Sequence, residues 1–109
     1  MKLPSAEDVE IEAAKIVGYL LSRSHPVGRF KARVFAAVGF DETNADAFAR
    51  EVRRIAAEGD VTTTQETKFG RKYTVPGELR GPSGALPVST GWFQEVGASG
   101  VRLVTVRPR

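Results

Sequence analysis

The sequence contains no cysteine and a single histidine among its 109 residues. Without cysteine, the chain can form neither a disulfide nor a thiolate metal site. A lone histidine leaves carboxylates as the remaining metal ligands, and these are scattered along the chain. We therefore expect no bound metal and no cofactor.

Long apolar stretches are also missing. No run approaches the ~20 residues that a membrane-spanning helix needs. The opening MKLPSAEDVE turns acidic at once and has no signal-like apolar segment. These absences predict a cytoplasmic protein without a membrane contact. Hydrophobic residues make up 41% of the chain and charged residues 27%, which predicts one folded domain spanning 1–109.

Basic residues outnumber acidic ones only slightly, with 16 Lys and Arg against 13 Asp and Glu and a formal net charge of +3. The basic residues cluster at 23–33, 50–54 and 68–72 and in the closing Arg-Pro-Arg. This distribution allows an anionic partner such as RNA without requiring one. A basic tail by itself is more often only solvated.

The first half of the chain has the apolar periodicity of helices. The pattern predicts helices over 12–22, 28–38 and 43–58. Gly39 is a natural C-terminal cap for the second helix, and Gly59 ends the third.

From Asp60 onward, β-branched residues and turn signals replace the helical pattern. Strands are predicted at 61–67, 71–75, 86–96 and 101–107. Because consecutive strands with short connections usually pair as neighbours, an antiparallel meander is expected. The sequence therefore predicts an α+β fold with three N-terminal helices packed on a four-stranded antiparallel sheet.

Lys31 lies on the apolar side of the predicted 28–38 helix. At about 100° per residue, it falls between Val38 and Phe35 on the helical wheel. The apolar arc contains Phe30, Val34, Phe35, Ala37 and Val38, and the opposite side contains Arg29, Ala32, Arg33 and Ala36. Lys31 either packs its stem and releases its ammonium to solvent, or reaches a cleft between helix and sheet. In that cleft, the helix dipole would lower its pKa, and it could bind a phosphate or exchange a proton.

Other polar residues extend this set of candidates. His25 is the only side chain with an ordinary pKa near neutrality, and Gly28 leaves backbone N–H groups that could hold a phosphate. Strand alternation places Arg71 and Tyr73 on one face and Lys72 on the other. Tyr73 fits the core, whereas Lys72 fits the open face, either as a solvated lysine or as a phosphate clamp.

The last two strands add four more residues. Trp92 and Thr90 share one face, where a tryptophan is more often core than a base-stacking platform. Alternation predicts Arg102 on the face of Val106 and Thr105 on the opposite face. Arg102 is either an edge residue or a bidentate phosphate ligand.

Four segments together resemble a known family: HPVGRFKARVFAAVGF at 25–40, FGRKY at 69–73, the T-x-W pattern ending at Trp92, and RLVT at 102–105. The chain resembles a small bacterial domain family of uncharacterised function. Its members occur as stand-alone proteins and at the C-termini of phage-head-morphogenesis-type polymorphic toxins. The GASG turn and the TVRPR ending depart from the family pattern.

The resemblance implies a toxin module, and toxin tips in that context are most often nucleases. The expected fold is similar to ribonucleases of the barnase and RelE type. Metal-independent cleavage of single-stranded RNA by 2′-hydroxyl attack needs a base, an acid and cations around the phosphorane. The candidate catalytic residues are His25, Lys31 and Lys72. The candidate phosphate- or substrate-binding residues are Gly28, Arg71, Tyr73, Thr90, Trp92, Arg102 and Thr105.

A non-catalytic alternative remains open, in which the chain is a protein-binding module and one half of a small two-protein system. Its exposed first strand would then pair with a partner strand. A toxin would also imply a small neutralising protein. An enzyme predicts that His25, Lys31 and Lys72 converge on one cleft. A binding module predicts that they scatter and that an apolar patch is exposed elsewhere.

Overall fold

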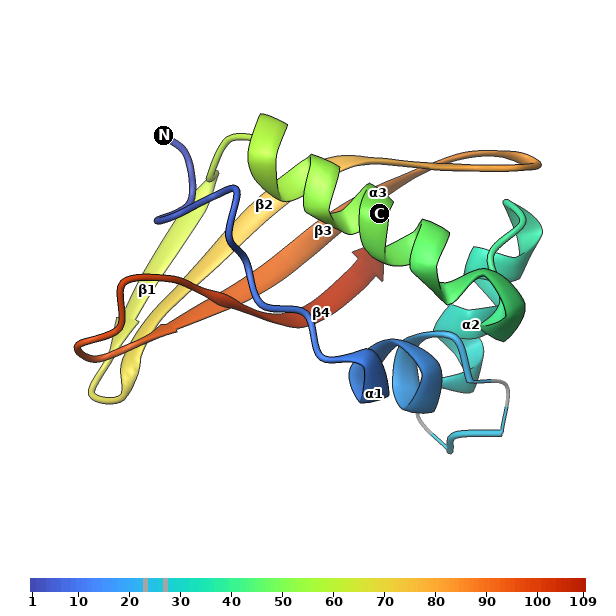
Figure 1. Cartoon of the computed structure of the whole chain (residues 1–109), viewed down its shortest axis with the longest axis horizontal. Coiled ribbons are helices and arrows are strands. Elements are labelled where there is room, and N and C mark those ends of the chain that lie inside the picture. The colour runs from blue at the N-terminus through green and yellow to red at the C-terminus, as the bar shows by residue number, and fades with distance from the viewer. Residues whose placement is uncertain (23, 27) are drawn as a thin grey trace.

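The computed structural model describes residues 1–22, 24–26 and 28–109. Helical segments occupy the N-terminal half and four strands the C-terminal half, so the α+β prediction is confirmed (Figure 1). The helical elements are α1 (Ala13–Lys15), the π-helix η1 (Ile16–Leu20), α2 (Arg29–Ala37), the 3₁₀-helix η2 (Glu42–Asn44) and α3 (Ala45–Glu58). The strands are β1 (Thr63–Thr67), β2 (Gly70–Gly81), β3 (Gly84–Glu95) and β4 (Arg102–Pro108).

Local capping explains where the helices begin and end. Gly39 adopts φ +99°, a left-handed conformation that glycine accepts without strain, and α2 ends before it. The Asp41 carboxylate accepts a 2.8 Å hydrogen bond from the Thr43 N–H, and the Asn44 side chain accepts one of 2.8 Å from the Asp41 N–H. This reciprocal capping box starts η2 and leads the chain into α3.

The sheet is an antiparallel meander with strand order β1-β2-β3-β4, as predicted. The β2–β3 hairpin is the longest pairing and runs from Gly70 opposite Glu95 to Gly81 opposite Gly84. Beyond β4, the N-terminal segment adds a parallel bridge between Glu10 and Arg102. At the other side of the sheet, β1 is an edge strand, and all five of its residues are exposed.

The core lies between α3 and one face of the sheet. Phe48 of α3 makes edge-to-face contacts with Phe35 at 5.1 Å and with Phe40 at 5.4 Å between ring centroids. A side chain at Gly77 would come within 2.7 Å of Ile55 Cγ2, so this glycine allows α3 to approach β2 closely. The sheet contributes Tyr73, Val75, Leu79, Val88, Thr90, Trp92, Leu103 and Val106 to the core.

The buried side of α2 differs from the prediction. Ala32 was expected on the solvent side but is buried, whereas Phe30 and Val34 are 57% and 38% exposed. The apolar arc predicted from Phe30 to Val38 was therefore wrong on one side. α2 packs against η1 and β4. Close approach to those elements favours a small side chain, so Ala32 is buried beside Phe35. Lys31 remains on the inward half of the helix and is half-buried.

A β-bulge between β3 and β4 corrects a second prediction. Gly91 pairs with Thr105, but Trp92 pairs with Leu103, so one extra residue of β4 lies opposite this step. The extra residue shifts the alternation. Arg102 and Thr105 therefore lie on the same face, and the prediction that Arg102 shares a face with Val106 was wrong.

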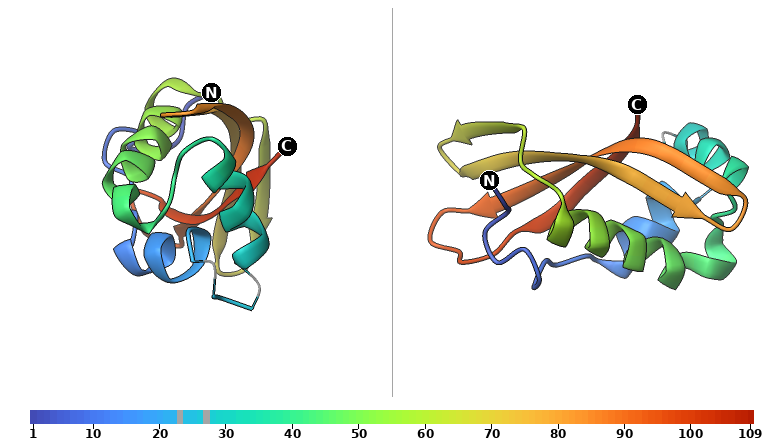
Figure 2. Two further views of the ribbon diagram at one scale, coloured as in Figure 1. Left: turned by 90° about the vertical axis from the view of Figure 1, so that its right-hand side faces the viewer. Right: turned by 90° about the horizontal axis from the view of Figure 1, so that it is seen from above.

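The face of the sheet opposite α3 is here called the open face. It carries Lys72, Thr74, Gly91, Phe93 and Thr105, by alternation with the buried positions. In the right-hand view of Figure 2, α3 lies along one side of the sheet, and α2 stands at one end. Within 1–22, 24–26 and 28–109, the helices are all too short or too polar to cross a bilayer.

Candidate functional site

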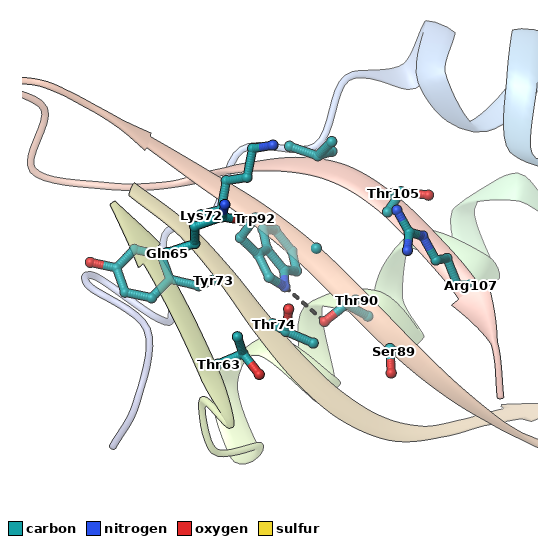
Figure 3. A pocket seen from close by; sticks show the side chains of 12 residues that line it. Thr63, Gln65, Lys72, Tyr73, Thr74, Ser89, Thr90, Trp92, Thr105 and Arg107 are labelled. Atoms are coloured by element: carbon teal, nitrogen blue, oxygen red, sulfur yellow. Dashed lines mark hydrogen bonds between the residues drawn. The ribbon is translucent and has the colours of Figure 1, made fainter. Parts of the chain in front are cut away.

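A pocket of about 290 Å³ lies over β2, β3 and β4, with its rim extended by β1 (Figure 3). We call it the open-face pocket. The residues that line it are Thr63, Gln65, Lys72, Tyr73, Thr74, Ser89, Thr90, Gly91, Trp92, Val104, Thr105 and Arg107.

The hollow depends on Gly91. This residue has no side chain, and a Cβ placed on it would come within 3.1 Å of Thr105 Cγ2. Beneath it, Trp92 Nε1 donates a 2.7 Å hydrogen bond to Thr90 Oγ1 (Figure 3). Thr90 Oγ1 in turn donates a 2.7 Å hydrogen bond to the Val75 carbonyl. Both side chains are buried and satisfied internally, so Thr90 and Trp92 form a rigid floor.

The lining has the charge and the donors that suit an anion. Lys72 and Arg107 are its charged side chains, and none of the twelve described lining residues is acidic. Lys72 and Gln65 lie on one side of the pocket, and Thr105 and Arg107 lie on the other (Figure 3). Hydrogen bonds from cationic donors to an anion are roughly twice as strong as those between neutral groups.

Lys31 reaches this site from α2. Its ammonium donates a 2.8 Å hydrogen bond to the Thr105 hydroxyl and lies 5.5 Å from the centre of the Tyr19 ring. The amine therefore ends where the helix meets the sheet. The pKa of Lys31 is lowered, chiefly by burial and then by the charges of Arg107 and Lys15. The helix dipole invoked from the sequence is not among these causes.

The Tyr19 ring lies between His25 and Lys31 and contacts both. Its imidazole packs edge-on against Tyr19, with ring centroids 4.8 Å apart, and its Nδ1 accepts a 3.0 Å hydrogen bond from the Gly28 N–H. A side chain at Gly28 would lie 2.1 Å from the Tyr19 carbonyl oxygen, so glycine is needed for this packing. Neither His25 nor Gly28 lines the described pocket.

The two remaining arginine candidates have acidic partners. Arg71 pairs with Glu66 at 2.7 Å, and Arg102 pairs with Glu95 at 3.3 Å. Neither arginine lines the open-face pocket. Tyr73 is buried and donates its hydroxyl to the Gln94 side chain at 2.9 Å.

The structure thus gathers six of the ten candidates around one pocket and leaves four outside it. Lys31 contacts the lining, and Lys72, Tyr73, Thr90, Trp92 and Thr105 belong to it. Arg107 was not among the candidates, although the last predicted strand, 101–107, ends on it. Gly91 was the sequence signal for the bulge beside the pocket, since a glycine within a strand often marks a bulge. In the described parts of the chain, no three His, Asp or Glu side chains are grouped so that they could hold a metal ion.

The chain is similar to known proteins in its sequence family and in its fold. A search of curated proteins found no match. A chain of a solved structure, "Contact-dependent growth inhibition toxin - immunity protein complex from Klebsiella pneumoniae 342", is 18% identical with a TM-score of 0.72. The match covers 91% of this chain and 98% of that chain. At this identity, the likeness shows a shared fold.

A family model described as "Domain of unknown function (DUF6883)" matches residues 2–109. This agrees with the resemblance to a family of uncharacterised function, while the toxin context of that family stays a prediction. Because the match spans nearly the whole chain, the protein belongs to the DUF6883 family.

Proposed function

We propose that the protein is a metal-independent ribonuclease that binds the backbone of single-stranded RNA in the open-face pocket. One observation carries the proposal: Lys72 from β2 lines a pocket whose described lining has no carboxylate, and the Lys31 ammonium from α2 bonds to Thr105 of that lining. Arg107 adds a third positive charge from β4. Such a lining suits a phosphodiester and offers no carboxylate ligand for a divalent cation.

The chemistry assigns a task to each cation. A base removes the proton of the ribose 2′-hydroxyl, the bond from O2′ to phosphorus forms, and the bond from phosphorus to O5′ breaks as an acid protonates that oxygen. Lys72 and Arg107 stabilise the charge of the phosphorane. Lys31, whose pKa is lowered, exchanges one of the protons. The second proton is exchanged with solvent water, because His25, the other candidate, packs behind the Tyr19 ring and does not line the pocket.

The fold comparison supports the biological setting of this proposal. The solved relative is a chain of a complex between a growth-inhibition toxin and its immunity protein. We propose that this chain likewise belongs to a two-protein system of toxin and immunity type. In that setting, a small neutralising protein would be its partner.

The test is cleavage of labelled single-stranded RNA by purified protein in the presence of EDTA. The expected products carry a 2′,3′-cyclic phosphate and a 5′-hydroxyl, and an oligonucleotide with 2′-O-methyl groups stays intact. Lys31→Ala should abolish cleavage and leave the thermal melt nearly unchanged. Lys68→Ala is the matched control, because Lys68 is exposed in the β1–β2 turn. Absence of cleavage by the wild type would overturn the proposal.

The exposed edge of the sheet favours a second candidate, a protein-binding module. Phe69 and Val96 are 68% and 76% exposed at the tips of neighbouring hairpins, and the Val96 N–H donates a 3.2 Å hydrogen bond to the Phe69 carbonyl. They form an apolar tip next to the edge strand β1, which could pair with a strand of another protein. This candidate predicts no RNA cleavage, and it predicts a co-purifying small protein that is lost with Phe69→Ser.

A further inference from the structure

A row of three side chains crosses the open face beside the pocket. Lys72 on β2 pairs in register with Phe93 on β3, which pairs with Arg102 on β4. Phe93 is two residues beyond Gly91 on the same face, so its ring stands next to the hollow. An aromatic ring between two cations on an otherwise open sheet is the arrangement by which sheet proteins stack bases of single-stranded nucleic acid.

The ring of Phe93 is held in place from two sides. A Cβ on Gly70 would lie 2.9 Å from Phe93 Cζ, so the edge of the ring at Cζ lies against the glycine backbone of β2. On β4, the guanidinium carbon of Arg102 lies 5.3 Å from the ring centre, and Arg102 Nε pairs with Glu95 at 3.3 Å. Phe93 nevertheless remains partly exposed. The ring and the guanidinium therefore form a fixed pair, and little entropy is lost when a ligand stacks on it.

The two hollows on either side of the Phe93–Arg102 pair differ in charge, so they distinguish the base of a nucleotide from its phosphate. A second hollow, about 520 Å³, adjoins Phe93 and Arg102 on the side away from the open-face pocket. Asp8, Glu10 and Glu95 line it, so it repels phosphate. The open-face pocket has no described carboxylate and attracts phosphate. These charges favour an orientation in which the phosphate of a nucleotide lies toward Lys72 and Arg107 and its base toward Phe93.

We infer that Phe93 and Arg102 form a stacking platform for one base of a single-stranded nucleic acid whose phosphate occupies the open-face pocket. This inference rests on the proposed function for the identity of the anion. It adds the requirement that the ligand be unpaired, because a base within a duplex cannot lie on the ring. It also places a recognition residue at Phe93, outside the cations that bind the backbone.

The experiment measures binding apart from cleavage. A fluorescently labelled 2′-O-methyl oligonucleotide, which cannot be cleaved by 2′-hydroxyl attack, is titrated with the protein at low salt, beside an abasic oligonucleotide of equal length. Phe93→Leu should weaken binding of the base-containing strand by roughly tenfold, the loss expected from one stacked base. Binding of the abasic strand should be unchanged. Phe93→Tyr, which keeps an aromatic ring, should bind the base-containing strand as tightly as the wild type.

Two further variants keep the test specific. Phe69→Leu is the matched control, since Phe69 is also exposed and has an ammonium, that of Lys68, 5.1 Å from its ring centre. It should leave both affinities unchanged. Arg102→Lys keeps the charge but loses the planar guanidinium, and it should weaken only the base-containing strand. This surface substitution also tests the platform if Phe93→Leu fails to fold.

The outcomes distinguish this inference from the proposed function. The stacking platform is wrong if Phe93→Leu or Phe69→Leu changes the affinity for the base-containing and the abasic oligonucleotide equally. It is also wrong if the protein binds neither oligonucleotide. If base-dependent binding requires Phe93 but ordinary RNA is never cleaved, the platform stands and the ribonuclease proposal fails. If RNA is cleaved at the same rate with and without Phe93, the ribonuclease proposal stands and the platform fails.

Discussion

The Lys31 ammonium donates a 2.8 Å hydrogen bond to the Thr105 hydroxyl and so joins α2 to β4 across 74 positions of sequence. Lys15 makes a neighbouring contact with the backbone of β4, because its ammonium donates a 3.1 Å hydrogen bond to the Val104 carbonyl. Two lysines from the helical half thus bond to consecutive residues of β4. Arg107 follows on that strand, and the three like charges raise the electrostatic potential where an anion would bind.

The charge of Arg107 should be readable in the protonation of Lys31. Arg107→Gln removes a positive charge that lowers the pKa of Lys31, so this pKa should rise toward the ordinary 10.5. It should stay below that value, because burial is the larger cause. An NMR titration of the Lys31 side chain measures the shift. Arg109→Gln is the control, since Arg109 is not among the causes. An unchanged Lys31 pKa in Arg107→Gln would contradict the assignment.

The same lowered pKa predicts how stability depends on pH. Between the folded pKa of Lys31 and the ordinary value, the unfolded chain binds more protons than the folded chain. The contribution of Lys31 to stability should therefore rise with pH across that window. Urea denaturation of wild type and Lys31→Met at several alkaline pH values measures it. The free energy of unfolding of the wild type minus that of Lys31→Met should rise with pH, and a fall would contradict the prediction.

Gly28 and Gly18 make a matched pair for testing the packing behind the site. A Cβ on Gly28 would lie 2.1 Å from the Tyr19 carbonyl oxygen, whereas a Cβ on Gly18 meets nothing within 4 Å. Gly28→Ala should destabilise the protein by about 2 kcal/mol or more, since backbone must move. Gly18→Ala should stay within about 0.5 kcal/mol. Equal free energies of unfolding for the two variants would show that Tyr19 does not pack on Gly28.

Thr90→Val tests the floor of the pocket at nearly constant volume. The change removes the acceptor of Trp92 Nε1 and the donor to the Val75 carbonyl, and both partners lie in the core. Each buried group left unsatisfied costs about 1–3 kcal/mol. Urea unfolding should therefore show a clear loss, and Thr64→Val on exposed β1 should show none. Near-UV circular dichroism of Trp92 should change with Thr90→Val only.

Filling the hollow should remove anion binding without removing any charge. Gly91→Leu places a side chain on the open face against Thr105, where even a Cβ is only 3.1 Å from Cγ2. Binding of the 2′-O-methyl oligonucleotide should fall to the level of Lys72→Gln. Circular dichroism checks that the sheet is intact. Unaltered affinity in folded Gly91→Leu protein would place the anion elsewhere.

Periodicity in the sequence predicted the larger part of the fold. Helical spacing located α2 and α3 to within two residues, and Gly39 and Gly59 ended them as expected. Alternation correctly separated Lys72 from Tyr73 and placed Trp92 and Thr90 in the core. These features depend on local backbone geometry, which neighbouring residues determine.

Other features lay beyond local pattern. The helical wheel of α2 predicted one apolar arc that left Ala32 outside, and the packing of α2 on η1 and β4 buries Ala32 instead of Phe30 and Val34. The bulge opposite Gly91 depends on how β3 and β4 pair, so strict alternation misplaced Arg102. Arg107 was placed at the end of a predicted strand and in a basic tail, and nothing in its own neighbourhood shows that β4 carries it to the pocket.

The sequence itself determined the order of helices and strands, the meander and the position of Lys31 on the inward half of its helix. Each of these features follows from residue spacing along a few helical turns or one strand. The partner of that lysine was decided only by the tertiary structure. Thr105 comes beside Lys31 when the sheet closes against the helical half, and the hollow at Gly91 exists only once three strands are paired. Contacts between residues far apart in the chain depend on how whole elements pack, and no local pattern encodes that packing.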